Sequence, residues 1–451
     1  MSCRAILSWF FGVVFCCLTG PCLAGEVRVL HGEPSPGTKN WMPGDVLVTG
    51  GVLNEVKPSI TSAPNGDLYM AVEELDSGYI RLYRSTDDGH TWGWVFAFAS
   101  GDDTRNPSVA YGEHSNGEKW VYVAYEQVTT ADDTRLVRVI RYNPITVAWD
   151  SQTIDGPFIM SGAADQVHPQ IITDHVDWGD DYYPYVTYAK FAIDYYPVFC
   201  SRSTDRGVAW STPLNVTGGS ENTSWPARPE IAYGFSGLFI TFVKPGWTGS
   251  SWSNQIWVTE SSDYGFSFTT PFQLTTTSNN VFHPVVAAAH GVGTLVVAFT
   301  MDFGADTDVT FTSSTDGGTT WGSVDILPWT FDYESSVDLA VSNSGGYFHA
   351  AYKHDDMAVD EIWYSSATVA APTVWSSAVV VNEGNTASAG FPRPTIAVNP
   401  AMSSDEEAAI AWTDWRQPYP PYDVYFDSAG LAFFADGFES GDVTAWSTSV
   451  P

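Results

Sequence analysis

One short pattern, S-x-D-x-G-x-x-W/F, occurs four times along the chain and constrains its fold more than any other feature. The Asp carboxylate can accept backbone amides of a turn, the Gly can take a positive φ, and the aromatic side chain can return to pack on a sheet. Each copy follows a strand-like stretch such as residues 80–84. The residues expected to build these turns are Asp87, Gly89, Trp92, Asp205, Gly207, Trp210, Asp263, Gly265, Phe268, Asp316, Gly318 and Trp321. Four such hairpins predict a repeated β-sheet unit.

A second element precedes the hairpins and occurs seven times. These short segments begin at Pro58, Pro107, Pro169, Pro229, Pro284, Val337 and Pro394. A spacing of roughly 50 to 60 residues fits one four-stranded blade with its loops. The chain is therefore predicted to be all-β, a seven-bladed β-propeller, and six blades plus an irregular segment is the alternative. The last copy lacks an outer strand, so we expect an N-terminal strand within residues 41–50 to close the ring and cover its open edge.

The turns and proline segments together resemble the Asp-box (BNR) repeat β-propellers, a sialidase-like superfamily. That group includes sialidases and non-enzymatic secreted proteins. The resemblance covers residues 41–434, and we place the propeller domain at 25–434. It implies that the Asp-box turns are structural and lie away from any active site.

The two ends of the chain predict an exported protein. Arg4 precedes an apolar run over 5–18 and a small-residue segment, which together indicate a signal peptide at 1–24. Its removal leaves Cys200 as the single cysteine. Residues 435–451 form a tail that resembles a C-terminal motif of bacterial exported proteins, or else a disordered end. We therefore expect a secreted, extracellular protein from a bacterium, and no later stretch is apolar enough to predict a membrane span.

Charge excludes one large class of partners. The chain has 19 Lys and Arg against 52 Asp and Glu, a formal net charge of -33. Such a field disfavours nucleic acid as a partner. No His or Cys pair has the spacing of a metal site, so we expect no metal and no cofactor. The resemblance to the sialidase-like superfamily implies a glycan or another extracellular ligand as the partner.

One position of the repeat gathers polar and basic side chains. It lies just before each proline segment, where the inner strands of a propeller start around the central channel. The seven residues there are Lys57, Asn106, His168, Arg228, His283, Ser336 and Arg393. This set predicts a throat that favours anions and binds them more tightly once the histidines protonate below about 6.5. Alternatively, each base pairs with a carboxylate; the available acids are Glu73, Glu74, Glu126, Asp302 and Asp414.

The resemblance to sialidases implies a specific catalytic set: three arginines on the sugar carboxylate, a tyrosine nucleophile activated by a glutamate, and an aspartate as acid/base. Here Lys57 stands one place from the expected first arginine, and lysine cannot replace a bidentate guanidinium without loss. Arg228 and Arg393 can supply two of the three, with Arg416 as a distant third. Candidate nucleophiles are Tyr419 and Tyr422.

Because this arginine set is incomplete, the catalytic residues stay unknown. The leading hypothesis is a secreted binding or scaffold module with an acidic glycan in the throat. An exo-glycosidase of sialidase type is the alternative.

Overall fold

A computed structural model describes residues 40–430 apart from short segments. The segments left out are 43, 51–52, 99–101, 130–131, 160–166, 175–182, 191–195, 219–226, 236, 328–329, 331, 343–345, 357–359, 384–392, 400–406 and 417–421. The predicted signal peptide and the C-terminal tail lie outside the described residues. In the described part every regular element is a β-strand. None of its segments forms an apolar helix of membrane-spanning length.

Six blades are four-stranded antiparallel sheets whose strands follow one another in chain order. The first three blades are β3 (Glu55–Ser62), β4 (Leu68–Glu74), β5 (Tyr79–Ser85) and β6 (Gly93–Phe98); β7 (Asp103–Glu113), β8 (Lys119–Thr129), β9 (Thr134–Tyr142) and β10 (Trp149–Ile159); and β11 (Gln170–Thr173), β12 (Pro184–Ala189), β13 (Val198–Arg202) and β14 (Leu214–Asn215).

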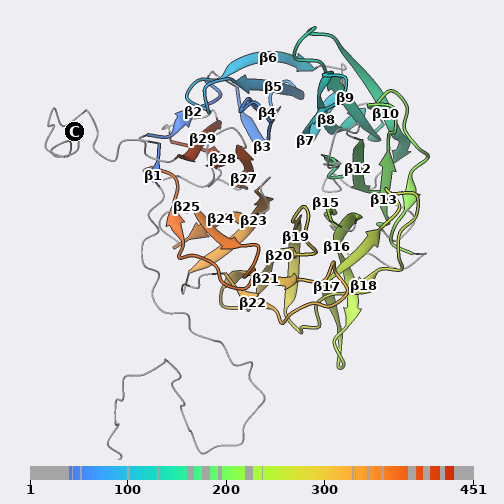
Figure 1. Cartoon of the computed structure of the whole chain (residues 1–451), viewed down its shortest axis with the longest axis vertical. Coiled ribbons are helices and arrows are strands. Elements are labelled where there is room, and N and C mark those ends of the chain that lie inside the picture. Colours follow the sequence, from blue (N-terminus) through green and yellow to red (C-terminus); the bar gives the residue numbers. More distant parts are fainter. Residues whose placement is uncertain are drawn as a thin grey trace, which may run out of the picture. The chain divides into compact units, whose positions relative to one another are not determined.

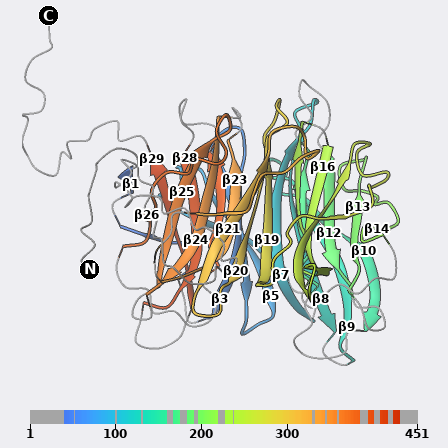
Figure 2. The same ribbon diagram turned by 90° about the horizontal axis from the view of Figure 1, so that it is seen from below.

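The next three blades repeat this order. They are β15 (Glu230–Gly234), β16 (Gly237–Trp247), β17 (Trp252–Ser261) and β18 (Phe272–Gln273); β19 (Asn280–Ala288), β20 (Leu295–Asp302), β21 (Thr307–Ser314) and β22 (Asp325–Ile326); and β23 (Tyr333–Val341), β24 (Tyr347–Asp355), β25 (Asp360–Thr368) and β26 (Val379–Val380). Figure 1 shows the blades placed around a central axis, and Figure 2 shows their strands running from one face of the ring to the other.

The seventh blade combines both ends of the propeller. Its inner strands are β27 (Thr395–Asn399), β28 (Glu407–Asp414) and β29 (Asp423–Gly430), and its outer edge is formed by β1 (Asn40–Trp41) and β2 (Val46–Leu47). Trp41 pairs with Ala429 and Leu47 with Tyr425, both antiparallel. The predicted seven blades and the predicted closure by an N-terminal strand are confirmed, and the six-bladed alternative is wrong.

The core lies between neighbouring blades. In β4 all seven residues are buried, because both faces of the sheet are covered by other blades. Tyr69 of the first blade stacks on Tyr111 of the second, with ring centroids 6.0 Å apart. Apolar clusters of this kind join each blade to the next, so the apolar packing forms a ring around the axis. The axis itself stays available for polar side chains.

All four S-x-D-x-G segments form the same turn. In the second of them the hydroxyl of Ser203 accepts the buried amide of Gly207 at 2.8 Å and donates to Asp205 at 2.8 Å. Gly207 has a φ of 80°, and its Cα lies so close to the preceding blade that a Cβ would meet Tyr122. The Asp carboxylate accepts the amide four residues on, at 2.8–2.9 Å, in the pairs Asp87–Thr91, Asp205–Ala209, Asp263–Ser267 and Asp316–Thr320.

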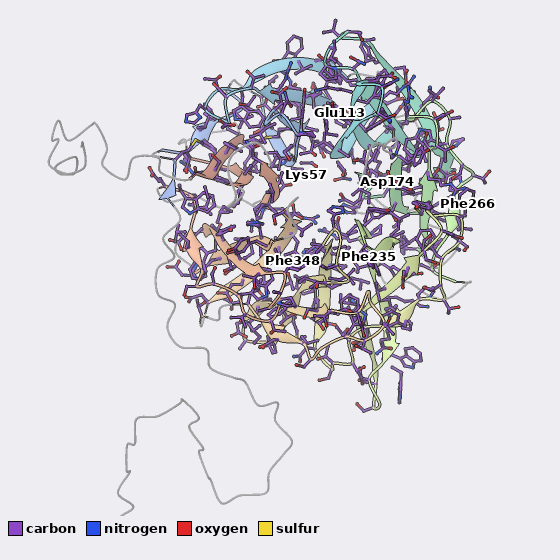
Figure 3. All side chains as sticks on the ribbon, viewed as in Figure 1. Lys57, Glu113, Asp174, Phe235, Phe266 and Phe348 are labelled. Atoms are coloured by element: carbon purple, nitrogen blue, oxygen red, sulfur yellow. The ribbon has the colours of Figure 1, made fainter. Side chains whose placement is uncertain are left out.

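The four aromatic side chains of these turns point back into the structure. Trp92, Trp210, Phe268 and Trp321 are partly buried and pack against the apolar clusters between blades. Each turn therefore also fastens its blade to a neighbour. Figure 3 places Phe266, from the third turn, at the outer rim and Lys57 beside the central opening.

Within this turn the serine should matter more than the aspartate. Ser203→Ala removes the acceptor of a buried amide, and we expect a loss of about 1–3 kcal/mol in the free energy of unfolding. The amide that Asp205 accepts is exposed and can bond water, so Asp205→Ala should cost less than about 1 kcal/mol. Urea denaturation of both variants checks the order. Equal losses, or a larger loss for Asp205→Ala, would contradict this assignment of roles.

Candidate functional site: a polar throat on the propeller axis

The residues predicted to ring the throat share an uncommon backbone conformation. Six of them have a left-handed φ between 39° and 56°, namely Lys57, Asn106, His168, Arg228, His283 and Ser336. Such values are uncommon for residues other than glycine. In four blades the pairing register also shifts at this position. A bulge of this type turns a side chain away from the strand face.

The bulges bring the whole ring to one place. All seven ring residues, Arg393 included, line a single cavity of about 1000 Å³. This is the geometry that the sequence predicted for the throat. The cavity also contains side chains two positions further along each inner strand, which the sequence reasoning missed. These are Ser59, Ser108, Gln170, Glu230, Val285, Asp338 and Thr395. The sequence does contain a signal for these positions: each lies two residues after a ring residue, and a regular strand places such residues on the same face.

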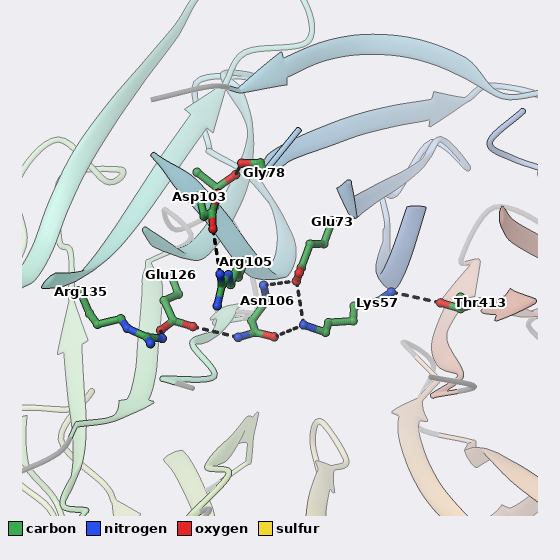
Figure 4. A network of polar contacts seen from close by, with 10 residues as sticks. Lys57, Glu73, Gly78, Asp103, Arg105, Asn106, Glu126, Arg135 and Thr413 are labelled. Atoms are coloured by element: carbon green, nitrogen blue, oxygen red, sulfur yellow. Dashed lines mark hydrogen bonds and ion pairs between the residues drawn. The ribbon is translucent and has the colours of Figure 1, made fainter. Parts of the chain in front are cut away.

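One side of the ring is already paired within the protein (Figure 4). The ammonium of Lys57 lies 2.9 Å from Glu73 and donates to the Asn106 amide oxygen at 3.0 Å. Asn106 in turn donates to Glu126 at 2.9 Å, and Glu126 is held by Arg135 at 2.5 Å. Of the two alternatives for the basic residues of the ring, Lys57 therefore follows the second: it is paired with a carboxylate of the protein.

The carboxylates of this network occupy an equivalent position near the end of the second strand of a blade. Glu73 lies opposite Val56, and Glu126 lies opposite Arg105. The equivalent residues in the third and fourth blades are Ala189 and Val243, whose amides bond the residues before His168 and Arg228. Arg228 lies where these two blades meet. Neither of these two equivalent positions gives Arg228 a carboxylate, and the acid that acts on it is Glu230, which raises its pKa in part.

Arg228 is consequently a half-buried cation with an unusual environment. Burial and the nearby Arg393 lower the pKa of Arg228 to about 10. Its Nε is buried and has no hydrogen-bond partner in the part of the chain that the structure describes. Arg393 makes one contact with a carboxylate, from Nη2 to the Glu230 Oε1 at 3.1 Å. The throat thus presents two guanidinium groups that its own acids only partly satisfy.

Two acids share this side of the cavity. Burial raises the pKa of Glu230 to about 7, although Arg393 lowers it in part. Burial also raises the pKa of Asp338, which accepts the Ile396 amide at 3.0 Å. A carboxyl group with a pKa near 7 is uncharged over much of the mildly acidic range. Glu230 therefore adds little negative charge opposite Arg228 and Arg393 in that range.

The two histidines of the ring do not behave as the sequence suggested. Burial, followed by repulsion from Arg228 and Arg393, lowers the pKa of both His168 and His283 well below the ordinary value. They stay neutral near pH 6.5, so the predicted gain of positive charge at that pH is wrong. A throat that tightens on anions in mild acid must use another group, and Glu230 is the one with a suitable pKa.

Other candidates lie away from the cavity. Arg416 is bonded to Asp45 and Asp414, so it does not join Arg228 and Arg393. Tyr422 lies against Trp415 with ring centroids 6.0 Å apart, and Tyr419 lies outside the described residues. Burial raises the pKa of the Cys200 thiol to about 12. Across the described ranges no three His, Cys, Asp or Glu residues are grouped to hold a metal ion.

Similarity to known proteins is found in solved structures alone. No protein-family model and no curated protein matches the chain. A crystal structure of a protein of unknown function from Dyadobacter fermentans matches with a TM-score of 0.52 and 13% identity, over 85% of this chain and 97% of that one.

Two further similar structures carry named activities. An alpha-L-arabinofuranosidase from Fusarium graminearum has a TM-score of 0.47 and 11% identity, over 75% of this chain and 100% of its own. A sialidase from Streptococcus pneumoniae has a TM-score of 0.42 and 11% identity, over 86% and 71%. At such identities the likeness concerns the propeller fold alone.

Proposed function

We propose that this protein is a secreted Asp-box propeller that binds an acidic glycan through Arg228 and Arg393 in the throat. The observation that carries the proposal is Arg228: a half-buried cation whose buried Nε has no hydrogen-bond partner among the described residues, and which Glu230 alone of the nearby acids acts on. A buried charge without a partner is costly. A carboxylate that fits the guanidinium fork offsets that cost and gains geometric specificity.

Binding of simple acidic sugars tests the proposal. Isothermal titration with N-acetylneuraminic acid and glucuronic acid should detect at least one of them, and Arg228→Met should weaken that binding at least tenfold. The same variant should not lower the unfolding midpoint, because it removes a buried charge that the fold does not satisfy. Loss of stability without loss of binding would contradict the proposal.

Arg105→Met is the matched control. Arg105 is adjacent to Asn106 of the ring, but its guanidinium is paired with Asp103 at 2.8 Å and is partly exposed. Unlike Asn106, Arg105 does not line the cavity. Its loss should leave the affinity unchanged. Equal weakening by Arg105→Met and Arg228→Met would indicate a bulk charge effect instead of a site.

Affinity for the acid should rise as the pH falls through about 7. Below its pKa of about 7 Glu230 is protonated and no longer neutralises Arg393, so the throat gains net positive charge. His168 and His283 add no charge in this range. Glu230→Gln should therefore bind tightly and almost independently of pH between about pH 5 and 8. Titrations at several pH values check this, and an unchanged pH profile in Glu230→Gln would show that Glu230 does not control the affinity.

A second function, exo-glycosidase activity of the sialidase type, is favoured by one observation. Glu230 retains a proton near neutral pH and shares the cavity with Asp338, an arrangement that suits a general acid beside a second carboxyl group. Release of 4-methylumbelliferone from its sialoside tests it directly. Turnover by the wild type that disappears in Glu230→Gln would identify an enzyme. Binding of the sialoside without turnover would support the binding module instead.

A further inference from the structure

The fourth blade carries a hairpin with two exposed indole rings. Strands β16 and β17 pair without a break up to Trp247 and Trp252, and residues 248–251 form the turn. The side chain of Trp247 is 49% exposed and that of Trp252 is 69% exposed. Their rings lie edge to face with centroids 5.9 Å apart. The fold gains little from burying either ring.

The base of this hairpin borders the throat cavity. Val243 of β16 and Asn254 of β17 both line the throat cavity. Trp252 lies two residues from Asn254 on β17 and so projects from the same face of the sheet, about 7 Å further along the strand. The base of the hairpin therefore touches the cavity, and the two indoles lie further out along the same pair of strands.

The hairpin is held in place by its own hydrogen bonds. In the turn the Thr248 amide donates to the Ser251 carbonyl at 2.9 Å, and the Ser251 amide donates to the Thr248 hydroxyl at 3.1 Å. At its base the Gln255 amide nitrogen donates to the Thr277 carbonyl at 2.7 Å. Because the turn is already ordered, the backbone that carries the two indoles does not have to be ordered when a ligand binds. The entropic cost of binding is correspondingly smaller.

The chemistry around the indoles is neutral. In a chain with a formal net charge of -33, the stretch 245–255 contains no charged residue. Its side chains are two indoles, the hydroxyls of one threonine and three serines, and the amides of Asn254 and Gln255. A sugar ring has a face of C–H groups that packs on an aromatic ring and an edge of hydroxyls that bonds to hydroxyl and amide groups. A charged partner would find no counter-charge on this stretch.

We propose that this aromatic hairpin, residues 245–255, is a binding site for a neutral sugar residue of a polysaccharide or oligosaccharide. The site is separate from the anion site of the throat and does not depend on it. Where a glycan carries both an acidic and a neutral sugar, the continuity of the two surfaces allows one chain to occupy both.

Affinity electrophoresis in gels containing arabinan, galactan, xylan, mannan or mixed-linkage β-glucan tests the proposal. The wild-type protein should be retarded by at least one of these neutral polysaccharides. Trp247→Ala and Trp252→Ala should each reduce that retardation at least fivefold. Both side chains are largely exposed, so the unfolding midpoints should stay close to that of the wild type.

Two control variants establish whether retardation depends on this hairpin in particular. Trp94→Ala removes another exposed indole, 61% exposed on the outer strand β6, and should keep full retardation. Arg228→Met should also keep it, because the throat anion site is not involved. Absence of retardation of the wild type in all five gels, unchanged retardation of both hairpin variants, or equal loss in Trp94→Ala would each overturn the proposal.

Discussion

Arg135→Met is expected to lower the free energy of unfolding by about 3–5 kcal/mol, the cost of breaking a buried ion pair from one side. The guanidinium of Arg135 is 1% exposed, and the Glu126 carboxylate that it holds at 2.5 Å is fully buried. Among the described residues, the carboxylate then keeps the Asn106 amide and the Val167 backbone amide as its donors. Urea denaturation of the variant measures the loss.

The same variant should show a pH-dependent defect. Burial already raises the pKa of Glu126 above its ordinary value, and Arg135 limits that rise. Removing Arg135 raises the folded-state pKa further, so the folded state holds a proton that the unfolded chain has lost. Stability then falls as the pH rises above the unfolded pKa of about 4.5. The defect should be smallest in acid and largest near neutral pH.

A second substitution decides whether the buried charge is the cause. Arg135→Met combined with Glu126→Gln leaves no buried charge, and part of the lost stability should return. Arg105→Met, which breaks a partly exposed pair, should cost less than about 1 kcal/mol. A loss below about 1 kcal/mol for Arg135→Met itself would show that Glu126 does not depend on this partner.

Gly89→Ala should be the most damaging glycine-to-alanine change among the four S-x-D-x-G turns. Gly89 has a φ of 89°, and a Cβ there would overlap the ring of Phe426, a fully buried residue of the closing blade. The left-handed backbone costs about 1–2 kcal/mol for a residue with a Cβ, and overpacking adds about 1–3 kcal/mol. Phe426 cannot move freely, since Trp92 packs edge-on against it at 5.2 Å.

Gly117→Ala provides the matched comparison. Gly117 has a φ of 80°, but nothing lies within 4 Å of the position of its Cβ. It should therefore show the backbone cost alone, and the difference between the two variants isolates the contact between the first and last blades. Thermal melting of both proteins checks this. Equal midpoints would mean that the contact between Gly89 and Phe426 adds nothing to stability.

The repeat in the sequence predicted the architecture because each blade obeys the same local rules. The proline segments located the inner strands, and the missing outer strand of the last blade predicted its closure by residues near Trp41. The ring of seven residues followed from one equivalent position. These features depend on the number of residues between motifs within one blade, and that number can be counted in the sequence.

The pairing inside the throat depends on relations between blades and could not be predicted in the same way. Glu73 reaches Lys57, whereas its neighbour Glu74 points to the other face of the sheet and binds Arg81. Asp414 binds Arg416 and so does not neutralise the throat arginines. Glu230 was overlooked because its role follows from burial beside Arg393. The pKa of His168 and His283 is likewise lowered mainly by burial, which the sequence does not show.

Closure of the last blade imposes an order on folding. Met42 donates to Asp427, a contact between residues 385 positions apart, so the ring can close only after nearly the whole propeller has been made. Six blades can form in turn from local hairpins, whereas the closing contacts span nearly the whole propeller, carry a large loop-closure entropy and should form last. Until then β29 has an unpaired outer edge that another chain can occupy. A protein shortened past Leu47 would thus be prone to form strand-exchanged assemblies.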